Sequence, residues 1–239
     1  MNDLSKLEKE LGINFKDKAT IRQAFIHRSF LNEAREKIPS NERLEFLGDS
    51  ILSYFISEYL YRNYPKLPEG ELTNLRSSVV KTSTLSDSAK QLDLGKYLKL
   101  SHGEEESGGR LNPSILADTF EALLGSVYMD GGLPPVTAIL KKTLYVLIPK
   151  IYKDKSYKDA KSSFQEIVQN EIKTSPVYRV VKEKGPDHAK QFTVGVFVND
   201  SKWGEGMGKN KQEAEQQAAT DALEKWKRTP YNTGNQDGS

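Results

Sequence analysis

Residues 41 to 52 place three carboxylates beside an apolar stripe on one predicted helix. The segment reads NERLEFLGDSIL, in which Glu42, Glu45 and Asp49 are separated by three, four and seven residues. On a helix this spacing puts the three acids on one face, next to an apolar period that continues to Phe55. Like charges at this spacing repel, and partly dehydrated carboxylates are costly without a compensating cation or donor. A bound metal ion would compensate them, and a solvated acidic face is the alternative.

A second segment carries acids on a helix that we expect to be enclosed by protein. Residues 114 to 128, SILADTFEALLGSVY, are apolar nearly all round. Asp118 and Glu121 are exceptions, and their spacing of three puts them on one face. Alone, this pair could mark a helix end or bind Arg43 or Arg76. Together, the two acidic segments favour a metal site.

The ligand types indicate which metal the site would take. A sixth acid, Glu69, stands in PEGEL, which we interpret as a short turn closed by Gly70. None of the three acidic segments contains Cys or His. Carboxylate oxygens are hard ligands that suit Mg²⁺ or Mn²⁺ better than Zn²⁺. The sequence therefore predicts a Mg²⁺ site at which Mn²⁺ would substitute.

Composition limits the class of protein. A chain of 239 residues has room for two modest domains that each bury a core. No apolar stretch reaches the roughly 18 to 20 residues needed to cross a membrane, and the N-terminal MNDLSKLEKELG lacks the apolar core of a secretory signal. The chain has no Cys, which excludes disulfides and thiolate metal sites. We expect a cytoplasmic protein with no membrane partner.

The chain divides near residue 154. Residues 1 to 150 show helical periods and no convincing alternating strand, which predicts an all-helical domain. The polar, Lys-rich residues 151 to 158 suit a linker, and residues 229 to 239 have the composition of a disordered tail. The helical periods are interrupted at Pro39, 65 to 70, 103 to 113 and 131 to 135.

After the predicted linker, residues 159 to 228 change period. The last helix, from Lys211, follows Asn210, a favourable N-cap residue. The predicted order is α-β-β-β-α. The expected elements are a helix at 159 to 173, strands at 177 to 183 and 191 to 198, a short strand or turn at 202 to 208, and a helix at 211 to 226.

These segments resemble the ribonuclease III family. NERLEFLGDS stands without a gap like the family's signature motif, and the second part is similar to the double-stranded-RNA-binding domain. The resemblance covers about residues 5 to 227. It implies an all-α endonuclease domain followed by a small α+β RNA-binding domain. The supporting blocks are HRSF at 27 to 30, EGEL at 69 to 72, SGGR at 107 to 110, ILAD…EAL at 115 to 123, GPDH at 185 to 188 and GMGKNKQEAE at 206 to 215.

The resemblance also implies an activity. A magnesium-dependent endoribonuclease of this family would hydrolyse double-stranded RNA with two metal ions that serve the attacking and leaving oxygens. The implied metal ligands are Glu45, Asp49, Asp118 and Glu121. The implied catalytic set is Asp49 and Glu121, with Glu42 and Glu69 as secondary carboxylates. The alternative is a non-cleaving double-stranded-RNA-binding protein of the same fold, and the presence of all six acids favours the enzyme.

The implied products require a dimer. They carry 5′-phosphate and 3′-hydroxyl ends with a two-nucleotide 3′ overhang, and the implied substrates are ribosomal RNA precursors and structured messenger RNA. Such an overhang needs two sites on opposite strands, hence a homodimer. Phe46 stands where the family inserts an aromatic side chain into the partner subunit, and a core Phe is the alternative. His27 and Arg28 are interpreted as packing and hydrogen-bonding groups at a helix end.

The second domain would read duplex RNA by its shape. A-form RNA presents 2′-hydroxyls across a shallow minor groove and hides its base edges in a deep major groove. Net charge is only +2 overall, so the electrostatic contribution must be local. Gln212 and Ala189 stand where the family usually has, or can have, a basic residue. The residues implied to bind RNA are Gln165, Glu166, His188, Lys209, Asn210 and Lys211.

Overall fold

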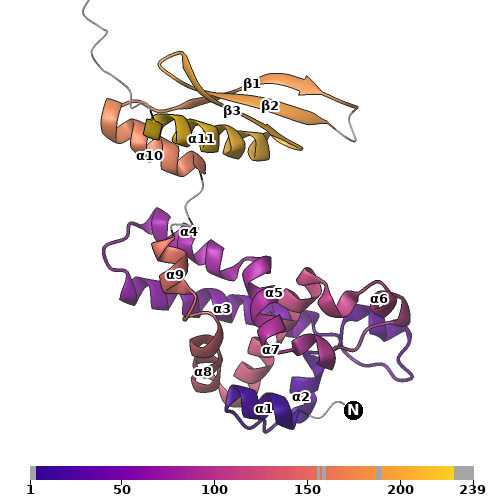
Figure 1. Cartoon of the computed structure of the whole chain (residues 1–239). Coiled ribbons are helices and arrows are strands. Elements are labelled where there is room, and N and C mark those ends of the chain that lie inside the picture. The colour runs from indigo at the N-terminus through magenta and orange to yellow at the C-terminus, as the bar shows by residue number, and fades with distance from the viewer. Residues whose placement is uncertain (1–3, 155–156, 158–159, 187–189, 229–239) are drawn as a thin grey trace, which may run out of the picture. The chain divides into compact units, whose positions relative to one another are not determined.

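The protein forms two compact units, Met1–Tyr157 and Lys158–Ser239, which we call the helical unit and the α+β unit (Figure 1). The structure, a computed structural model, describes residues 4–154, 157, 160–186 and 190–228. The predicted contacts of His188 and Ala189 therefore lie outside the described residues. Within the described residues, no helix is long and apolar enough to cross a membrane.

The helical unit confirms the predicted all-helical domain. In its described part, the only strand-like pairing is one isolated bridge between Ile26 and Lys99. The elements are α1 (Ser5–Leu11), α2 (Lys18–Gln23), η1 (Arg28–Asn32), α3 (Glu42–Asn63), α4 (Glu69–Val80), α5 (Thr82–Gln91), η2 (Leu94–Tyr97), α6 (His102–Glu106), η3 (Gly109–Leu111), α7 (Pro113–Gly131), α8 (Leu133–Thr143) and α9 (Ile148–Lys153).

Helix α7 runs through the middle of the helical unit (Figure 1). The Asn112 side chain caps it by accepting a hydrogen bond from the Ser114 amide at 2.9 Å, and Pro113 occupies the first turn, where a missing amide proton is tolerated. Phe120 and its apolar neighbours on α7 are buried on nearly every side. The acids on this helix therefore project from a rigid, enclosed element.

Two glycines bring α3 and α7 into backbone contact. A Cβ atom at Gly48 would lie 1.8 Å from the Glu121 carbonyl oxygen, and one at Gly125 would lie 2.2 Å from the Leu44 carbonyl oxygen. Contacts under 3.0 Å are not tolerated, so only glycine fits at these two positions. The crossing point lies within one turn of acids on both helices, which brings those acids together.

The α+β unit confirms the predicted α-β-β-β-α order. Its three strands form one antiparallel sheet in the order β1-β2-β3, and both helices cover one face of it (Figure 1). The third segment, predicted as a short strand or turn, is a full strand of eight residues. The elements are α10 (Ala160–Ile172), β1 (Val177–Lys184), β2 (Gln191–Val198), β3 (Ser201–Gly208) and α11 (Lys211–Arg228).

Strand β3 also uses glycines to approach a helix. Gly204 and Gly206 alternate along β3, and their period of two aims both at α11. A Cβ atom at Gly206 would lie 2.2 Å from the Ala218 amide nitrogen. Ala218 and Ala222 on α11 are fully buried against the strand. Small residues on both sides let the strand and the helix pack backbone to backbone.

The helical unit continues past residue 150, where the sequence predicted a linker at 151–158. Helix α9 extends to Lys153, and the Tyr157 hydroxyl donates to the Glu71 carboxylate at 2.8 Å. Tyr152 packs against the rings of Tyr64 and Tyr157 at centroid distances of 4.8 and 6.1 Å. These aromatic contacts tie a Lys-rich segment to the helical unit, which its polar composition did not indicate.

Candidate functional site

Three carboxylates from two helices converge beside the glycine contact. Glu45 on α3 and Asp118 and Glu121 on α7 each place a carboxylate oxygen within 4.8 Å of the others. All three side chains are half-buried. None forms an ion pair with a Lys, Arg or His within the described residues. We call these three residues the acid cluster.

Burial and repulsion between neighbouring carboxylates make the charged form of the acid cluster unfavourable. Burial raises the pKa of Glu121 to about 8, with further contributions from Asp49, Asp118 and Glu45. Burial also raises the pKa of Glu45, assisted by Asp118, Glu42 and Asp49, and it raises the pKa of Asp118. At neutral pH the cluster therefore favours a bound proton or a bound cation.

Asp49 and Glu42 stand at the exposed side of the acid cluster. Both are exposed on α3, and both add negative potential at Glu45. Glu42 accepts a hydrogen bond from the Ser40 hydroxyl at 2.7 Å and lies 4.0 Å from the Arg28 guanidinium. Glu42 and Asp49 therefore lie on the same side of α3 as Glu45 of the acid cluster.

Glu69 lies away from the acid cluster of its own chain. It is the first residue of α4 and not part of the predicted turn, because Pro68 stands at the N-cap and starts the helix. Arg76 on α4 donates to the Ser57 hydroxyl on α3 at 2.9 Å, so the two helices form an antiparallel hairpin. Glu45 lies in the first turn of α3, whose 22 residues span about 33 Å. Glu69 follows the opposite end.

His27 has an electrostatic role that sequence reasoning missed. As expected of a helix-end residue, its Nδ1 accepts from the Ser29 amide at 3.3 Å and caps η1. The Ser29 hydroxyl in turn accepts from the Ser101 amide at 3.0 Å. The charge of His27 also lowers the pKa of Asp118, against the effect of burial. The HRSF motif marks the cap, but only the fold brings His27 close to Asp118.

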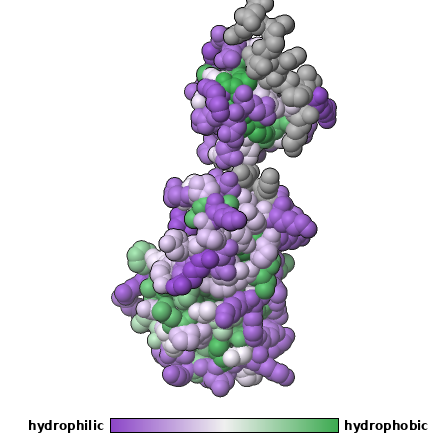
Figure 2. Space-filling view, turned by 90° about the vertical axis from the view of Figure 1, so that its left-hand side faces the viewer, coloured by the Kyte–Doolittle hydropathy of each residue, from purple (hydrophilic) through white to green (hydrophobic). Residues whose placement is uncertain are grey.

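Phe46 is exposed and does not belong to the core of the helical unit. Its side chain is 77% exposed, which rules out the core alternative. Tyr54 and Tyr61, the latter 76% exposed, lie on the same face of α3 at helical spacing. Figure 2 shows apolar side chains at the surface of this unit. Three large aromatic residues on one helix face form an unusual surface for a monomer.

The described candidates for RNA binding lie on the surface of the α+β unit. Gln165 and Glu166 are exposed on α10. Lys209 and Lys211 are exposed at the start of α11, where backbone amides of the first turn add positive potential.

Asn210 has a structural task at the start of α11. Its side-chain oxygen accepts from the Glu213 amide at 2.8 Å, which confirms the predicted N-cap. The Glu213 carboxylate accepts in return from the Lys209 amide at 2.8 Å. This reciprocal capping fixes the conformation of the basic turn between β3 and α11.

Comparisons with known proteins agree with both units. The family described as Ribonuclease-III-like matches residues 17–145, and the Double-stranded RNA binding motif matches residues 160–226. Ribonuclease 3 of Oceanobacillus iheyensis is 44% identical over 225 residues, covering 93% of this chain and 97% of the relative. Ribonuclease 3 of Pelotomaculum thermopropionicum is 46% identical over 223 residues, covering 93% and 92%.

A solved structure supports the assignment of the helical unit. The nuclease domain of ribonuclease III from Campylobacter jejuni, studied for flexibility in a region involved in dimer formation, is 36% identical with a TM-score of 0.57. The match covers 62% of this chain and 99% of that domain. The chain therefore belongs to the ribonuclease III family, with a nuclease domain followed by a double-stranded-RNA-binding domain.

Proposed function

We propose that the protein is an endoribonuclease that cleaves double-stranded RNA by metal-dependent phosphodiester hydrolysis. The acid cluster is the observation that carries this proposal, because it stands in one chain with an RNA-binding domain. Three half-buried carboxylates that repel one another cost folding free energy, and RNA binding alone does not require them. The cluster therefore favours the enzyme over the non-cleaving alternative.

The acid cluster fits a hard divalent cation. Its donors are all carboxylate oxygens, which suit Mg²⁺ and allow Mn²⁺ to substitute. Burial is the main cause of the raised pKa of Glu121, and a cation that replaces the bound proton would offset the cost of burying its negative charge. We assign Glu45, Asp118 and Glu121 as ligands, together with Asp49, whose charge acts on two of them.

The chain's own residues would position and polarise the reaction. Two bound divalent cations would supply a nucleophilic water at neutral pH and offset charge on the leaving 3′ oxygen. The glycine contact between α3 and α7 holds Glu45 and Glu121 in place, so little reorganisation is needed when RNA binds. Glu42, which is exposed, would hold hydrogen-bonded water at the edge of the cluster.

The α+β unit would hold the duplex. Gln165 and Glu166 on α10 would contact 2′-hydroxyls in the minor groove, while Lys209 and Lys211 would contact phosphates. These contacts read shape and charge and not base sequence. We propose that the enzyme acts in the cytoplasm on ribosomal RNA precursors and structured messenger RNA, with His188 as a further RNA contact.

A second copy of the chain would complete the enzyme. The exposed aromatic face of Phe46, Tyr54 and Tyr61 is where we propose that two copies pack. Two acid clusters could then cut opposite strands and leave two-nucleotide 3′ overhangs with 5′-phosphate and 3′-hydroxyl ends. Because Glu69 lies far from the acid cluster of its own chain, any catalytic role for it must be exercised in the partner's site.

Cleavage of a long RNA duplex tests the function directly. With Mg²⁺ the protein should yield the ends described above, and without divalent cations it should yield none. Glu121→Gln keeps the size of the side chain but removes a charged ligand, so cleavage should fall by orders of magnitude while duplex binding persists. Glu10→Gln, which changes an exposed acid of α1, is the matched control. Near-normal turnover of Glu121→Gln in Mg²⁺ would contradict the assignment.

Mixed dimers test the role of Glu69. If Glu69 acts in the partner's site, a dimer of one Glu69→Gln chain and one Glu121→Gln chain contains one intact site and one doubly altered site. Mixing the two impaired proteins should then give more nicking of a single strand than either protein gives alone. If Glu69 acts within its own chain, every site in the mixed dimer lacks one acid. A mixture as inactive as its parents, with subunit exchange verified, would refute the proposed arrangement.

A further inference from the structure

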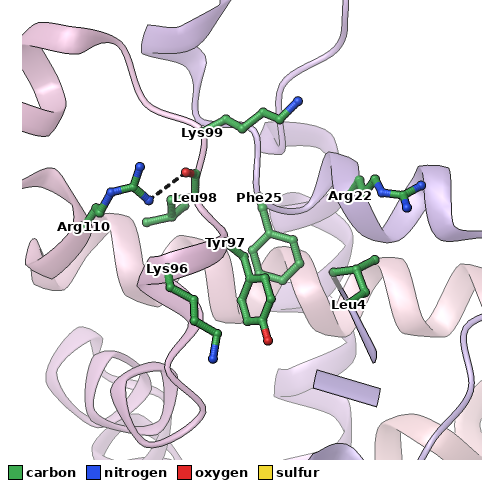
Figure 3. A pocket seen from close by; sticks show the side chains of 8 residues that line it. All are labelled: Leu4, Arg22, Phe25, Lys96, Tyr97, Leu98, Lys99 and Arg110. Carbon is green, nitrogen blue, oxygen red and sulfur yellow. Dashed lines mark hydrogen bonds between the residues drawn. The ribbon is translucent and has the colours of Figure 1, made fainter. Parts of the chain in front are cut away.

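The helical unit contains a cavity of about 320 Å³ that the acid cluster does not line. Its wall comes from the start of α1, from α2 and the residues that follow it, from η2 and the residues that follow it, and from η3 (Figure 3). The lining holds four cationic side chains and no carboxylate. The lining residues are Leu4, Arg22, Phe25, Lys96, Tyr97, Leu98, Lys99 and Arg110.

Two of the four cations remain without a counter-charge. Lys96 binds the Asp93 carboxylate at 2.8 Å. Arg110 binds the Glu105 carboxylate, with a shortest distance of 2.7 Å, and also donates to the Leu98 carbonyl (Figure 3). Arg22 and Lys99 have no carboxylate within ion-pair distance in the described part of the chain. The cavity therefore carries about two uncompensated positive charges.

Two buried donors at the cavity also lack acceptors. Tyr97 is only 4% exposed, and its hydroxyl donates to no acceptor among the described residues. The buried Nε of Arg22 likewise has none. Buried polar groups are nearly always satisfied, so each of these requires explanation. The neighbouring ammonium groups of Lys96 and Lys99 are donors themselves and cannot accept a proton from either group. An anion in the cavity would supply acceptors beside an excess of positive charge.

We propose that this cavity binds a small phosphomonoester of the mononucleotide class. A phosphomonoester carries about −1.5 to −2 charge at neutral pH, which matches the charges of Arg22 and Lys99. The apolar side chains of Leu4, Phe25 and Leu98 would contact the body of the ligand. The volume lies at the small end of the range for ligand sites, about 300 to 1,000 Å³, and excludes a duplex. The ligand is either a free mononucleotide or the 5′-phosphorylated end of an RNA strand.

Calorimetric titration of the full-length protein tests the site. The experiment uses metal-free buffer at constant ionic strength, with inorganic phosphate, adenosine 5′-monophosphate and adenosine as probes. The monophosphate should bind with one site per chain and more tightly than phosphate, and adenosine should give no signal. A two-nucleotide RNA, tested with and without a 5′-phosphate, distinguishes a free mononucleotide from the 5′-phosphorylated end of an RNA strand as the ligand. If its phosphorylated form binds more tightly than the monophosphate, the ligand is an RNA end.

Substitutions locate the binding. Arg22→Gln should weaken the affinity for adenosine 5′-monophosphate about tenfold or more, because it removes a charged donor. Tyr97→Phe should weaken it about threefold, since it removes one neutral donor. Lys141→Gln, an exposed cation on α8, should leave it unchanged. If circular dichroism shows that Arg22→Gln does not fold, Arg22→Lys, which retains the charge, is measured in its place.

Two results would overturn the proposal. One is the absence of binding by both phosphate and the monophosphate at millimolar concentration. The other is binding that survives the Arg22 and Tyr97 substitutions, which would place the anion elsewhere.

Discussion

Both units bring a helix into backbone contact through glycines, but the two contacts have different surroundings. In the α+β unit, Gly206 of β3 meets Ala218 of α11, and the residues around the contact are buried and apolar. In the helical unit, Gly48 of α3 meets α7 beside Glu45 and Glu121. The first contact packs the core of the α+β unit and holds no buried charge. The second uses the same close approach to hold together charges that would otherwise separate.

This difference makes the stability of the helical unit depend on pH at its glycine contact. The pKa of Glu121 is raised from its ordinary value of 4.5 to about 8 in the folded, metal-free protein. The folded state therefore keeps a proton that the unfolded chain has already released. Its contribution to stability is fully present below pH 4.5 and is lost as pH rises towards 8. The contact in the α+β unit contains no such group.

The largest effect should come from adding one methyl group at either contact. Gly48→Ala would push α3 from α7, and Gly206→Ala would push β3 from α11, each at a cost of about 1 to 3 kcal/mol or more. Gly48→Ala should abolish cleavage and spare RNA binding, while Gly206→Ala should weaken RNA binding and spare Mg²⁺ binding. Filter binding and Mg²⁺ titration of both variants would measure this. Equal loss of both properties in either variant would show that the contacts are not independent.

A smaller effect is expected at the exposed aromatic face. Phe46→Ala removes a proposed anchor of the dimer, and truncation of such a residue typically costs about 2 kcal/mol or more. Sedimentation over a dilution series should show a weaker dimer. Met207→Ala, which truncates an exposed apolar residue of the α+β unit, is the control. An unchanged Phe46→Ala dimer would remove this face from the interface.

His27 should tune the protonation of the acid cluster. Its charge lowers the pKa of Asp118, so His27→Gln should raise that pKa. An NMR titration of the Asp118 carboxyl in the metal-free wild-type protein and variant would measure the difference. An unchanged pKa of Asp118 in the variant would indicate that His27 acts only as the cap of η1.

The smallest effect concerns one phosphate contact. Gln212 is exposed in the first turn of α11, and Gln212→Lys should steepen the log–log salt dependence of duplex binding by about 0.9 if duplex RNA behaves like B-DNA. The gain should be the same for two unrelated sequences, because phosphate contacts do not read bases. Gln217→Lys adds the same charge on another face of α11. If both variants respond equally, the placement of this helix on RNA is wrong.

The periodicity of the sequence predicted which acids share a helix face. It did not predict which residues from distant segments lie close together. Helical spacing placed Glu45 on one face of its helix and Asp118 with Glu121 on one face of another, and the structure joins the two sets. The position of Glu69 could not be predicted, because PEGEL begins a helix whose place depends on how α4 folds back on α3. The proximity of His27 to Asp118 likewise depends on packing between distant segments.

Contacts made by Gly48 and Arg110 were also not predictable from the sequence. Gly48 lies inside the signature segment, but its function as a contact point depends on the backbone of Glu121, a residue far away in the sequence. Residues 103 to 113 were expected to interrupt the helical pattern, yet they contain most of α6 and all of η3, because Arg110 binds Glu105 and the carbonyl oxygen of Leu98. Such contacts leave no periodic signal.

Proton release on Mg²⁺ binding tests the central claim most directly. Titration calorimetry at pH 7 in two buffers of different ionisation enthalpy counts the protons that leave when the cation enters. Because Glu121 has a pKa of about 8 without metal, the wild-type protein should release about one proton per chain. Glu121→Gln should release almost none and bind Mg²⁺ more weakly. Mg²⁺ binding with no proton release by the wild-type protein, or equal release by both proteins, would contradict the assignment of the acid cluster as the metal site.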